Sequence, residues 1–235
     1  MAYDVKIFDD FYQTVLGSAV CQIFYDKIKQ TWPTLNEDVL FVGYGLPFAT
    51  KFGEDAVSSN FFIPIAKHIN FSPNIAEDRC IVGDDGYIPI QDNSYKYIVV
   101  IHALEHALDP KVFLREVWRV LKPEGRVIFI VPNRRRVWSS VEKTPFGHGN
   151  PYSTNQLKTA LENRLLIPQK NTTALFLPPS QFFAVPRLLS AAEWVLKGWL
   201  HGMGGVHFIE AKKQVYGALT MPLAEKTKQA HPQKS

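Results

Sequence analysis

Two glycines follow an apolar run near the start of the chain. Val39 to Val42 is apolar throughout and leads into Gly43-Tyr44-Gly45-Leu46-Pro47. Such a run predicts a buried strand that ends in a tight turn. Because glycine has no Cβ, the turn would let a ligand approach the backbone. An ordinary tight turn explains the glycines equally well. The candidate ligand-binding residues here are Gly43, Tyr44, Gly45 and Leu46.

A pair of acids follows a second, very short apolar segment. Asp84 and Asp85 come directly after the strand predicted over Cys80–Val82. A carboxylate at the carboxyl end of a parallel strand lies at the edge where ligands bind, and there it can accept a hydrogen bond from a purine amine. Asp84 is therefore a candidate for this contact, with Asp85 beside it. A solvated acidic turn is the alternative.

Two histidines and a glutamate are spaced His102-x-x-Glu105-His106. This spacing also occurs in inverted zinc peptidases. Zinc would require both histidines on one face of a stable helix, together with a third ligand. Here His102 directly follows the strand predicted over Tyr97–Ile101, so we predict no metal site. We expect Glu105 and His106 to tie the turn to neighbouring backbone.

A basic run and a further histidine lie beyond the next predicted strand, Arg126–Val131. Arginine side chains recognise acidic groups well, although a solvated basic turn would have the same composition. His148 lies between two glycines and is a candidate general base, since imidazole titrates near neutral pH. The candidate substrate-binding residues are Arg134, Arg135 and Arg136.

Strands without alternation, separated by helices, indicate a parallel sheet covered on both faces. Apolar spacing predicts one long helix over Phe8–Trp32, ended by Pro33. Asp109 is the predicted N-cap of a helix that starts with Pro110. The remaining predicted elements are strands over Asn60–Ala66, Thr172–Leu177 and Val206–Gly217, and helices over Ser153–Asn163 and Gln181–Leu200.

The run from Asp84 to Pro132 resembles class I S-adenosylmethionine-dependent methyltransferases of the type 11 group. Their pattern, GD…LPFPDNSFD…HxLEH…REvxRVLKPGG…vPN, is matched here in order and spacing, and the match extends over Val39–Asn133. The residues beyond are similar to an uncharacterised subgroup that we associate with alphaproteobacteria.

The resemblance implies a Rossmann-like fold. Its sheet would be seven-stranded and mostly parallel, with the last strand antiparallel and helices on both faces. The resemblance also implies S-adenosylmethionine as the cofactor. The turn Gly43–Leu46 would wrap the methionine portion, and Asp84 would meet the adenine amine with Asp85 beside it. His102 would lie next to the cofactor and the substrate cleft.

Four positions depart from the family pattern. Phe41 stands where the family has an acid, Pro47 replaces the third glycine, and Lys96 replaces an aspartate. A carboxylate about 20 residues beyond the loop normally holds ribose hydroxyls. Residues 63–67 contain none. These departures motivate an alternative function: a catalytically degenerate methyltransferase-like module that binds or regulates a partner.

Composition excludes several other classes. The 235 residues are 46% hydrophobic and 20% charged, which is typical of a globular protein and excludes a disordered chain. A net charge of +4 without a recognised binding module argues against nucleic acid as the partner. A nicotinamide dehydrogenase would also need the missing ribose carboxylate. The two cysteines, Cys21 and Cys80, suggest buried thiols in a reducing compartment.

We therefore predict methyl transfer from S-adenosylmethionine to an unidentified small-molecule acceptor. We expect a helical cap over residues 1–35, a methyltransferase-like domain over 36–220 and a flexible tail over 221–235. Without a signal peptide or membrane span, the expected location is the cytoplasm. For the apolar stretch 182–200 four interpretations remain: a packed helix, a lid, a membrane-surface contact or a homodimer face.

Overall fold

The structure is a computed structural model that describes residues 3–48, 51–52, 59–64, 66–67, 79–179 and 203–215. Its centre is a seven-stranded sheet. All neighbouring strands are parallel except for the two pairs that β9 makes. This confirms the predicted sheet with an antiparallel last strand. In spatial order the strands are β5 (Cys80–Gly83), β3 (Ser59–Pro64), β2 (Val39–Gly43), β6 (Tyr95–Ile101), β7 (Leu121–Pro132), β9 (Val206–Lys213) and β8 (Leu166–Ala174).

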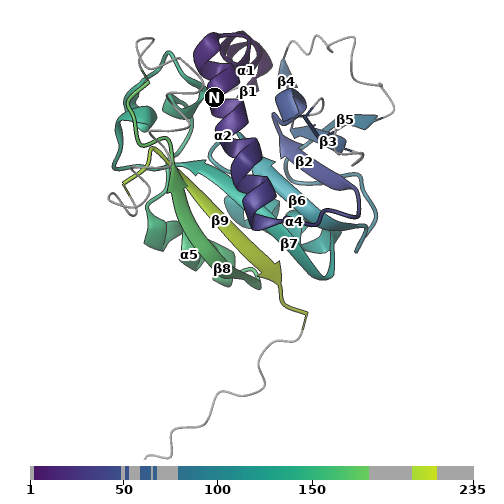
Figure 1. The fold of residues 1–235 in the computed structure, drawn as a ribbon. Helices are drawn as coiled ribbons and strands as arrows, with labels where there is room; N and C mark the ends of the chain where they lie inside the picture. Colours follow the sequence, from purple (N-terminus) through teal and green to yellow (C-terminus); the bar gives the residue numbers. More distant parts are fainter. Residues whose placement is uncertain are drawn as a thin grey trace, which may run out of the picture.

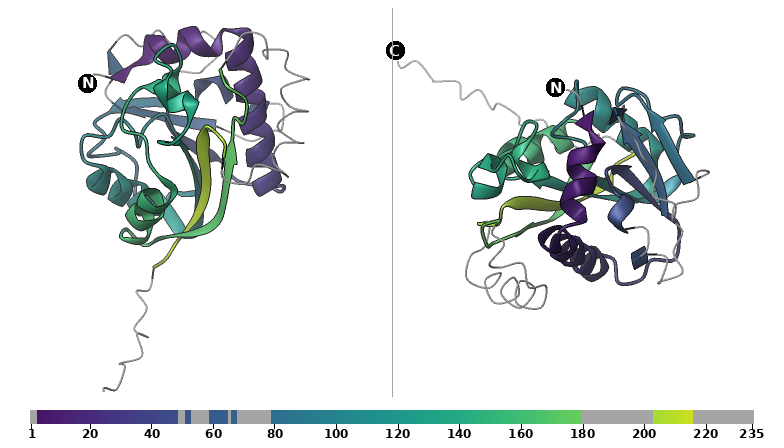
Figure 2. Two further views of the ribbon diagram at one scale, coloured as in Figure 1. Left: turned by 90° about the vertical axis from the view of Figure 1, so that its left-hand side faces the viewer. Right: turned by 90° about the horizontal axis from the view of Figure 1, so that it is seen from above.

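Helices cover both faces of this sheet, as predicted (Figures 1 and 2). The helix α2 (Val15–Thr31) packs on one face, and α4 (Pro110–Val120) and α5 (Thr154–Glu162) pack on the other. Neighbouring strand residues point to opposite faces. Phe41 accordingly joins the apolar cluster of α2, whereas Leu40 joins that of α4. Both clusters consist of buried apolar side chains, so the sheet is a well-packed base for its carboxyl edge.

The N-terminal segment is two helices, so the prediction of one helix over Phe8–Trp32 is wrong. The first, α1 (Val5–Tyr12), ends before Thr14, and α2 begins after it. The Thr14 hydroxyl donates to Phe11 O at 2.7 Å and accepts from Gly17 N at 3.0 Å, so this side chain replaces helical backbone bonds. The predicted end near Trp32 is confirmed. Figure 1 shows α1 above the carboxyl ends of the parallel strands.

Two later strands begin before their predicted starts. β7 starts at Leu121 rather than Arg126, with Glu124 at a positive φ of 64° near its beginning. β8 covers Leu166–Ala174 rather than Thr172–Leu177. It lies at the edge of the sheet, and its middle residues are exposed and polar, so it lacks the apolar run that signals a buried strand. The predicted helix over Gln181–Leu200 lies outside the described residues.

The small elements complete the described chain. A separate parallel pair joins β1 (Tyr3–Asp4) to β4 (Ala66–Lys67). Single 3₁₀ turns are η1 (Leu46–Phe48), η3 (Val137–Ser140) and η4 (Pro145–Gly147). Cys21 is buried as predicted, whereas Cys80 is only half-buried. Within the described ranges, no helix has the length and apolar character needed to cross a bilayer.

The cap of α4 generates the first prediction. Asp109 accepts hydrogen bonds from Lys111 N at 2.8 Å and Val112 N at 3.3 Å, and Pro110 is the first helical residue, as predicted. Asp109→Ala should lower the free energy of unfolding by about 1 kcal/mol in urea denaturation, because two amides lose their acceptor. Asp109→Asn keeps an acceptor and is the matched control. Equal losses in both variants would contradict the capping role.

A buried histidine on β9 generates the second prediction. His207 is fully buried, with Nε2 at 3.0 Å from Tyr152 O. Burial lowers the pKa of His207 below its ordinary value of about 6.5. The unfolded chain therefore binds this proton at a higher pH than the folded chain does. Stability should consequently decrease as pH falls below about 6.5.

The measurement is the free energy of unfolding in urea at several pH values between 7.5 and 5. Carboxylates and His106 also contribute to the slope, so the comparison is with His207→Gln. The variant should lose less stability across this range than the unsubstituted protein. Parallel pH profiles would contradict the assignment.

Candidate functional site

The turn after β2 is pressed against the end of β6. Gly43 has φ = +103°, and a Cβ at this position would collide with the backbone oxygen of Ile101. The next amide, Tyr44 N, donates to that same oxygen at 3.1 Å. Only glycine satisfies both constraints. The turn Gly43–Leu46 therefore lies directly beside the residue that follows Ile101, which is His102.

His102 is fully buried at this carboxyl edge and has φ = +52°, which is rare for a residue with a side chain. Its Nε2 lies 2.9 Å from the hydroxyl of Tyr12 on α1. Its Nδ1 lies 3.6 Å from Glu105 Oε1. Its ring packs against Phe8 and Phe146, with centroids at 4.9 and 4.8 Å. Three segments thus converge on one imidazole.

The helix α1 covers the glycine turn. Phe8 stacks on Tyr44 with ring centroids 5.4 Å apart, and the Tyr44 hydroxyl donates to Asp9 Oδ1 at 2.9 Å. Tyr44 is 3% exposed as a result. Burial, reinforced by Asp9, raises the pKa of Tyr44, so the phenol stays protonated. The residue pattern alone did not predict these contacts with α1. The polar Asp9 and Tyr12 beside Phe8 on an otherwise apolar face were the available signal.

Glu105 is buried beside His102, with 1% of its surface exposed. Within the described part of the chain, neither carboxylate oxygen has a hydrogen-bond partner. The prediction that this side chain ties the turn to neighbouring backbone is therefore wrong. That link is made by the main chain, since Glu105 O accepts from Asn150 N at 2.7 Å. Burial lowers the pKa of the adjacent His106 and favours its neutral form.

The two acids after β5 take different partners. Asp84 is exposed, and its Oδ1 accepts from Gly86 N at 2.7 Å, which is the bond of an acidic turn. Asp85 Oδ2 accepts from Leu108 N at 2.8 Å, so it links this turn to the segment after His102. Burial raises the pKa of Asp85, with Asp84 adding to the effect. Both acids lie at the carboxyl end of an edge strand.

An aromatic ring occupies one position where the family pattern has an acid. Phe41 is fully buried between Phe48 and Phe61, with ring centroids 5.6 and 5.5 Å away. A Cβ on Gly45 would collide with the Phe41 side chain. The part of β3 that the structure describes, Ser59–Pro64, carries no carboxylate. Lys96 forms an ion pair with Glu37 at 3.0 Å.

The remaining predicted site residues lie on the loops after β7. Of the three arginines, Arg134 and Arg135 are exposed and Arg136 is half-buried. His148 Nε2 lies 2.8 Å from Glu142 O in the same loop. This loop reaches His102 through Phe146. Phe146 therefore connects the loop to the site, whereas His148 contacts Glu142 of its own loop.

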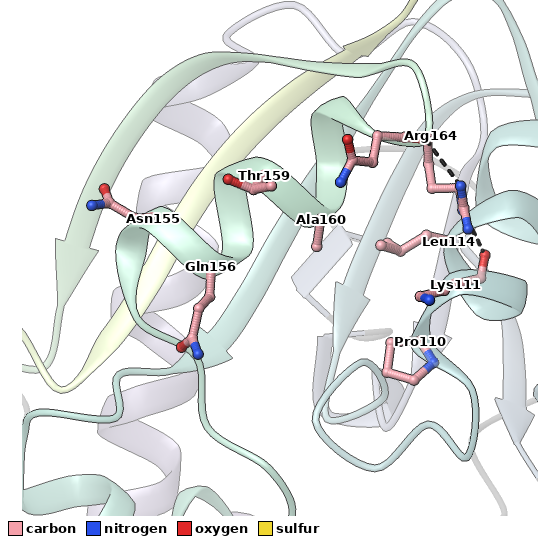
Figure 3. Close-up of a pocket in the computed structure, with 9 residues that line it drawn as sticks. Pro110, Lys111, Leu114, Asn155, Gln156, Thr159, Ala160 and Arg164 are labelled. Atoms are coloured by element: carbon pink, nitrogen blue, oxygen red, sulfur yellow. Dashed lines mark hydrogen bonds between the residues drawn. The ribbon is translucent and has the colours of Figure 1, made fainter.

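A groove of about 710 Å³ opens between α4 and α5 (Figure 3). Apolar side chains such as Leu114 and Ala160 line it together with amides, and Arg164 Nε donates to Lys111 O at 3.2 Å across its end. None of its lining residues belongs to the glycine turn, the acid pair or the His102 segment. It is a separate surface feature.

Comparison with known proteins gives a family match for part of the sequence and similar solved structures for the fold. Residues 58–129 match the family model of the type 11 methyltransferases, described as "Methyltransferase domain". Over 84 residues the chain is 33% identical to a Mycolicibacterium smegmatis protein described as "Probable S-adenosylmethionine-dependent methyltransferase". That match covers 36% of this chain and 31% of the relative, so about a third of the relative's length is represented.

Solved structures of other proteins share the architecture. A SAM-dependent methyltransferase from Thermotoga maritima superposes with a TM-score of 0.61 at 17% identity, covering 89% of this chain and 96% of that one. The YcgJ protein from Bacillus subtilis superposes with a TM-score of 0.56 at 16% identity, covering 82% and 98%. The chain therefore has the Rossmann-like methyltransferase fold, and its residues 58–129 carry the sequence of a methyltransferase domain.

Proposed function

We propose that this protein transfers a methyl group from S-adenosylmethionine to a small-molecule acceptor. The observation that carries the proposal is the meeting of the Gly43–Leu46 turn with His102 at the carboxyl ends of two central parallel strands. In an open α/β sheet, ligands bind at this edge. The methyltransferase-domain match over residues 58–129 supports the assignment of the chemistry. The residues after Pro132 support the alphaproteobacterial-like subgroup.

The residues at this edge fit two parts of the cofactor, its methionine portion and its adenine. The turn Gly43–Leu46 would hold the methionine portion, and His102 lies beside it. Asp84 is exposed at the end of β5, where it would accept from the adenine amine, with Asp85 beside it. For the ribose, residues 63–67, where the family has its carboxylate, contain no acid. When bound, the cofactor supplies an electrophilic methyl group on a sulfonium.

The protein's own contribution is to hold the acceptor in line with the methyl group and to exclude water. Phe8 and Phe146 provide an apolar surround at His102. Arg134, Arg135 and Arg136 would draw in an acceptor with an acidic group. We retain His148 as a candidate base for such an acceptor. Because His102 is fully buried beneath α1, entry of the acceptor requires α1 to move, with Thr14 as the break between the helices.

The alternative is a degenerate module that binds a partner without catalysis. It is favoured by one observation, the packing of Phe41 between Phe48 and Phe61 at a position where the family has an acid. The two functions differ in whether the protein binds the cofactor. We place either activity in the cytoplasm, since two unpaired cysteines fit a reducing compartment.

The third prediction tests cofactor binding. Titration calorimetry of the cofactor-stripped protein with S-adenosylhomocysteine should give a micromolar Kd. Asp84→Ala should weaken this affinity at least tenfold, about 1.4 kcal/mol, because the adenine amine loses a charged acceptor. The control is Glu162→Ala, an exposed acid at the end of α5, which should bind as the unsubstituted protein does. The enzymatic proposal fails if the unsubstituted protein does not bind at millimolar ligand.

A further inference from the structure

We propose that His102, supported by Glu105, is the general base that removes the proton from the methyl acceptor, and that this acceptor is an aromatic hydroxyl compound. The inference rests on the proposed methyl transfer and goes beyond it, since it assigns the proton acceptor and the substrate class. It starts from two buried groups that the fold alone does not explain.

The first observation is the isolation of the Glu105 carboxylate. It is 1% exposed, and no hydrogen bond from the described residues reaches either oxygen. A buried carboxyl without donors costs stability, and such groups in native proteins are usually retained for a purpose. The imidazole of His102 lies beside it, with Nδ1 3.6 Å from Oε1. A carboxylate there stabilises the imidazolium that forms when Nε2 takes a proton.

The second observation is what Nε2 faces. With its proton on Nδ1, toward Glu105, the imidazole accepts at Nε2, and the group that donates there is the phenol of Tyr12 at 2.9 Å. The rings of Phe8 and Phe146 flank the imidazole. The site therefore already contains an aromatic hydroxyl group surrounded by aromatic rings. This hydroxyl belongs to α1, the helix that must move for the acceptor to enter. We infer that an acceptor phenol takes the position of Tyr12.

The positive φ of His102 supports a functional role. A left-handed conformation is strained for a residue with a side chain, and such strain gathers at active sites. Here it turns the imidazole back beneath α1, between Tyr12 and Glu105.

The step balances in atoms and charge. The acceptor hydroxyl gives its proton to His102 Nε2, and its oxygen uses a lone pair to form the new O–C bond to the methyl group. The S–C bond breaks, and its electron pair remains on sulfur. The positive charge lost from sulfur appears on the imidazolium, where Glu105 lies beside it. The products are a methyl ether and S-adenosylhomocysteine, and the imidazolium releases its proton to water.

The titratable groups around His102 come from four segments. They are Asp9 and Tyr12 on α1, Tyr44 on the glycine turn, Glu105 and His106 on its own loop, and His148 after η4. Of these, Glu105 is the acid that lies against the imidazole, with Oε1 3.6 Å from Nδ1. We therefore expect its substitution to change proton transfer at His102.

The fourth prediction uses 4-nitrophenol as a probe, because its anion absorbs visible light and its proton transfer is read without cofactor. Tyr12→Ala should bind the probe at least tenfold more tightly than the unsubstituted protein, since the position beside Nε2 is opened. The bound probe should ionise at a pH where the free probe is still protonated. His102→Asn in the Tyr12→Ala background should abolish this ionisation, and Glu105→Gln should shift it to higher pH.

Circular dichroism and thermal unfolding of each variant verify folding, and Tyr12→Phe, which keeps the ring in place, is the matched control. With tritiated methyl on S-adenosylmethionine, His102→Asn should reduce methylation of the probe by about 10²–10⁴-fold. A folded Tyr12→Ala protein that leaves the probe protonated would overturn the proposal. So would ionisation that survives His102→Asn but is lost in His148→Asn.

Titration of the same samples with S-adenosylhomocysteine separates the two proposals. Binding of this ligand without ionisation of 4-nitrophenol overturns the base and the hydroxyl acceptor, while methyl transfer stands. Ionisation without binding of this ligand refutes methyl transfer and with it the role of His102 in that reaction.

Discussion

The contact between the glycine turn and the end of β6 determines the geometry of the whole carboxyl edge. Ile101 O accepts from Tyr44 N and leaves no space for a Cβ on Gly43. The obstruction is backbone, so no side-chain rotation could relieve it. It also fixes the point at which β6 ends, and His102 leaves that point with a left-handed φ. The positions of Tyr12, Glu105 and Phe146 around the imidazole all follow from where this residue is placed.

Sequence signals were reliable where the physics is local. The apolar run before Gly43 and the N-cap at Asp109 each depend on residues a few positions apart, and the structure has both. The pairing of Tyr12 with His102 joins residues 90 positions apart, and no spacing rule predicts it. The break at Thr14 was hidden because the apolar spacing continues across it. The edge strand β8 was misplaced because its exposed residues carry no apolar signal.

Phe41 and the missing ribose carboxylate differ in their expected effect on cofactor binding. Without a carboxylate at residues 63–67, the ribose hydroxyls of a bound cofactor would lack one charged acceptor, which costs roughly 1–3 kcal/mol if they are dry. That corresponds to about 5- to 150-fold in Kd, so a micromolar affinity would become at worst submillimolar. Phe41 is held between two rings and is completely buried, so it belongs to the core beneath the site. Neither departure is therefore expected to abolish the proposed cofactor binding.

The covering helix imposes a second cost on any ligand. An α-helix of eight residues is too short to be stable alone, so α1 depends on its contacts. Two hydrogen bonds, Tyr12–His102 and Asp9–Tyr44, contribute about 1 kcal/mol each, and the stack of Phe8 on Tyr44 about 0.5–1.5. If α1 were displaced and nothing replaced its contacts, the apparent affinity of a ligand would therefore fall by about two orders of magnitude. A ligand that brings its own hydroxyl to His102 and its own ring to Phe146 restores part of what is lost. This selects for aromatic hydroxyl compounds over aliphatic ones of the same size.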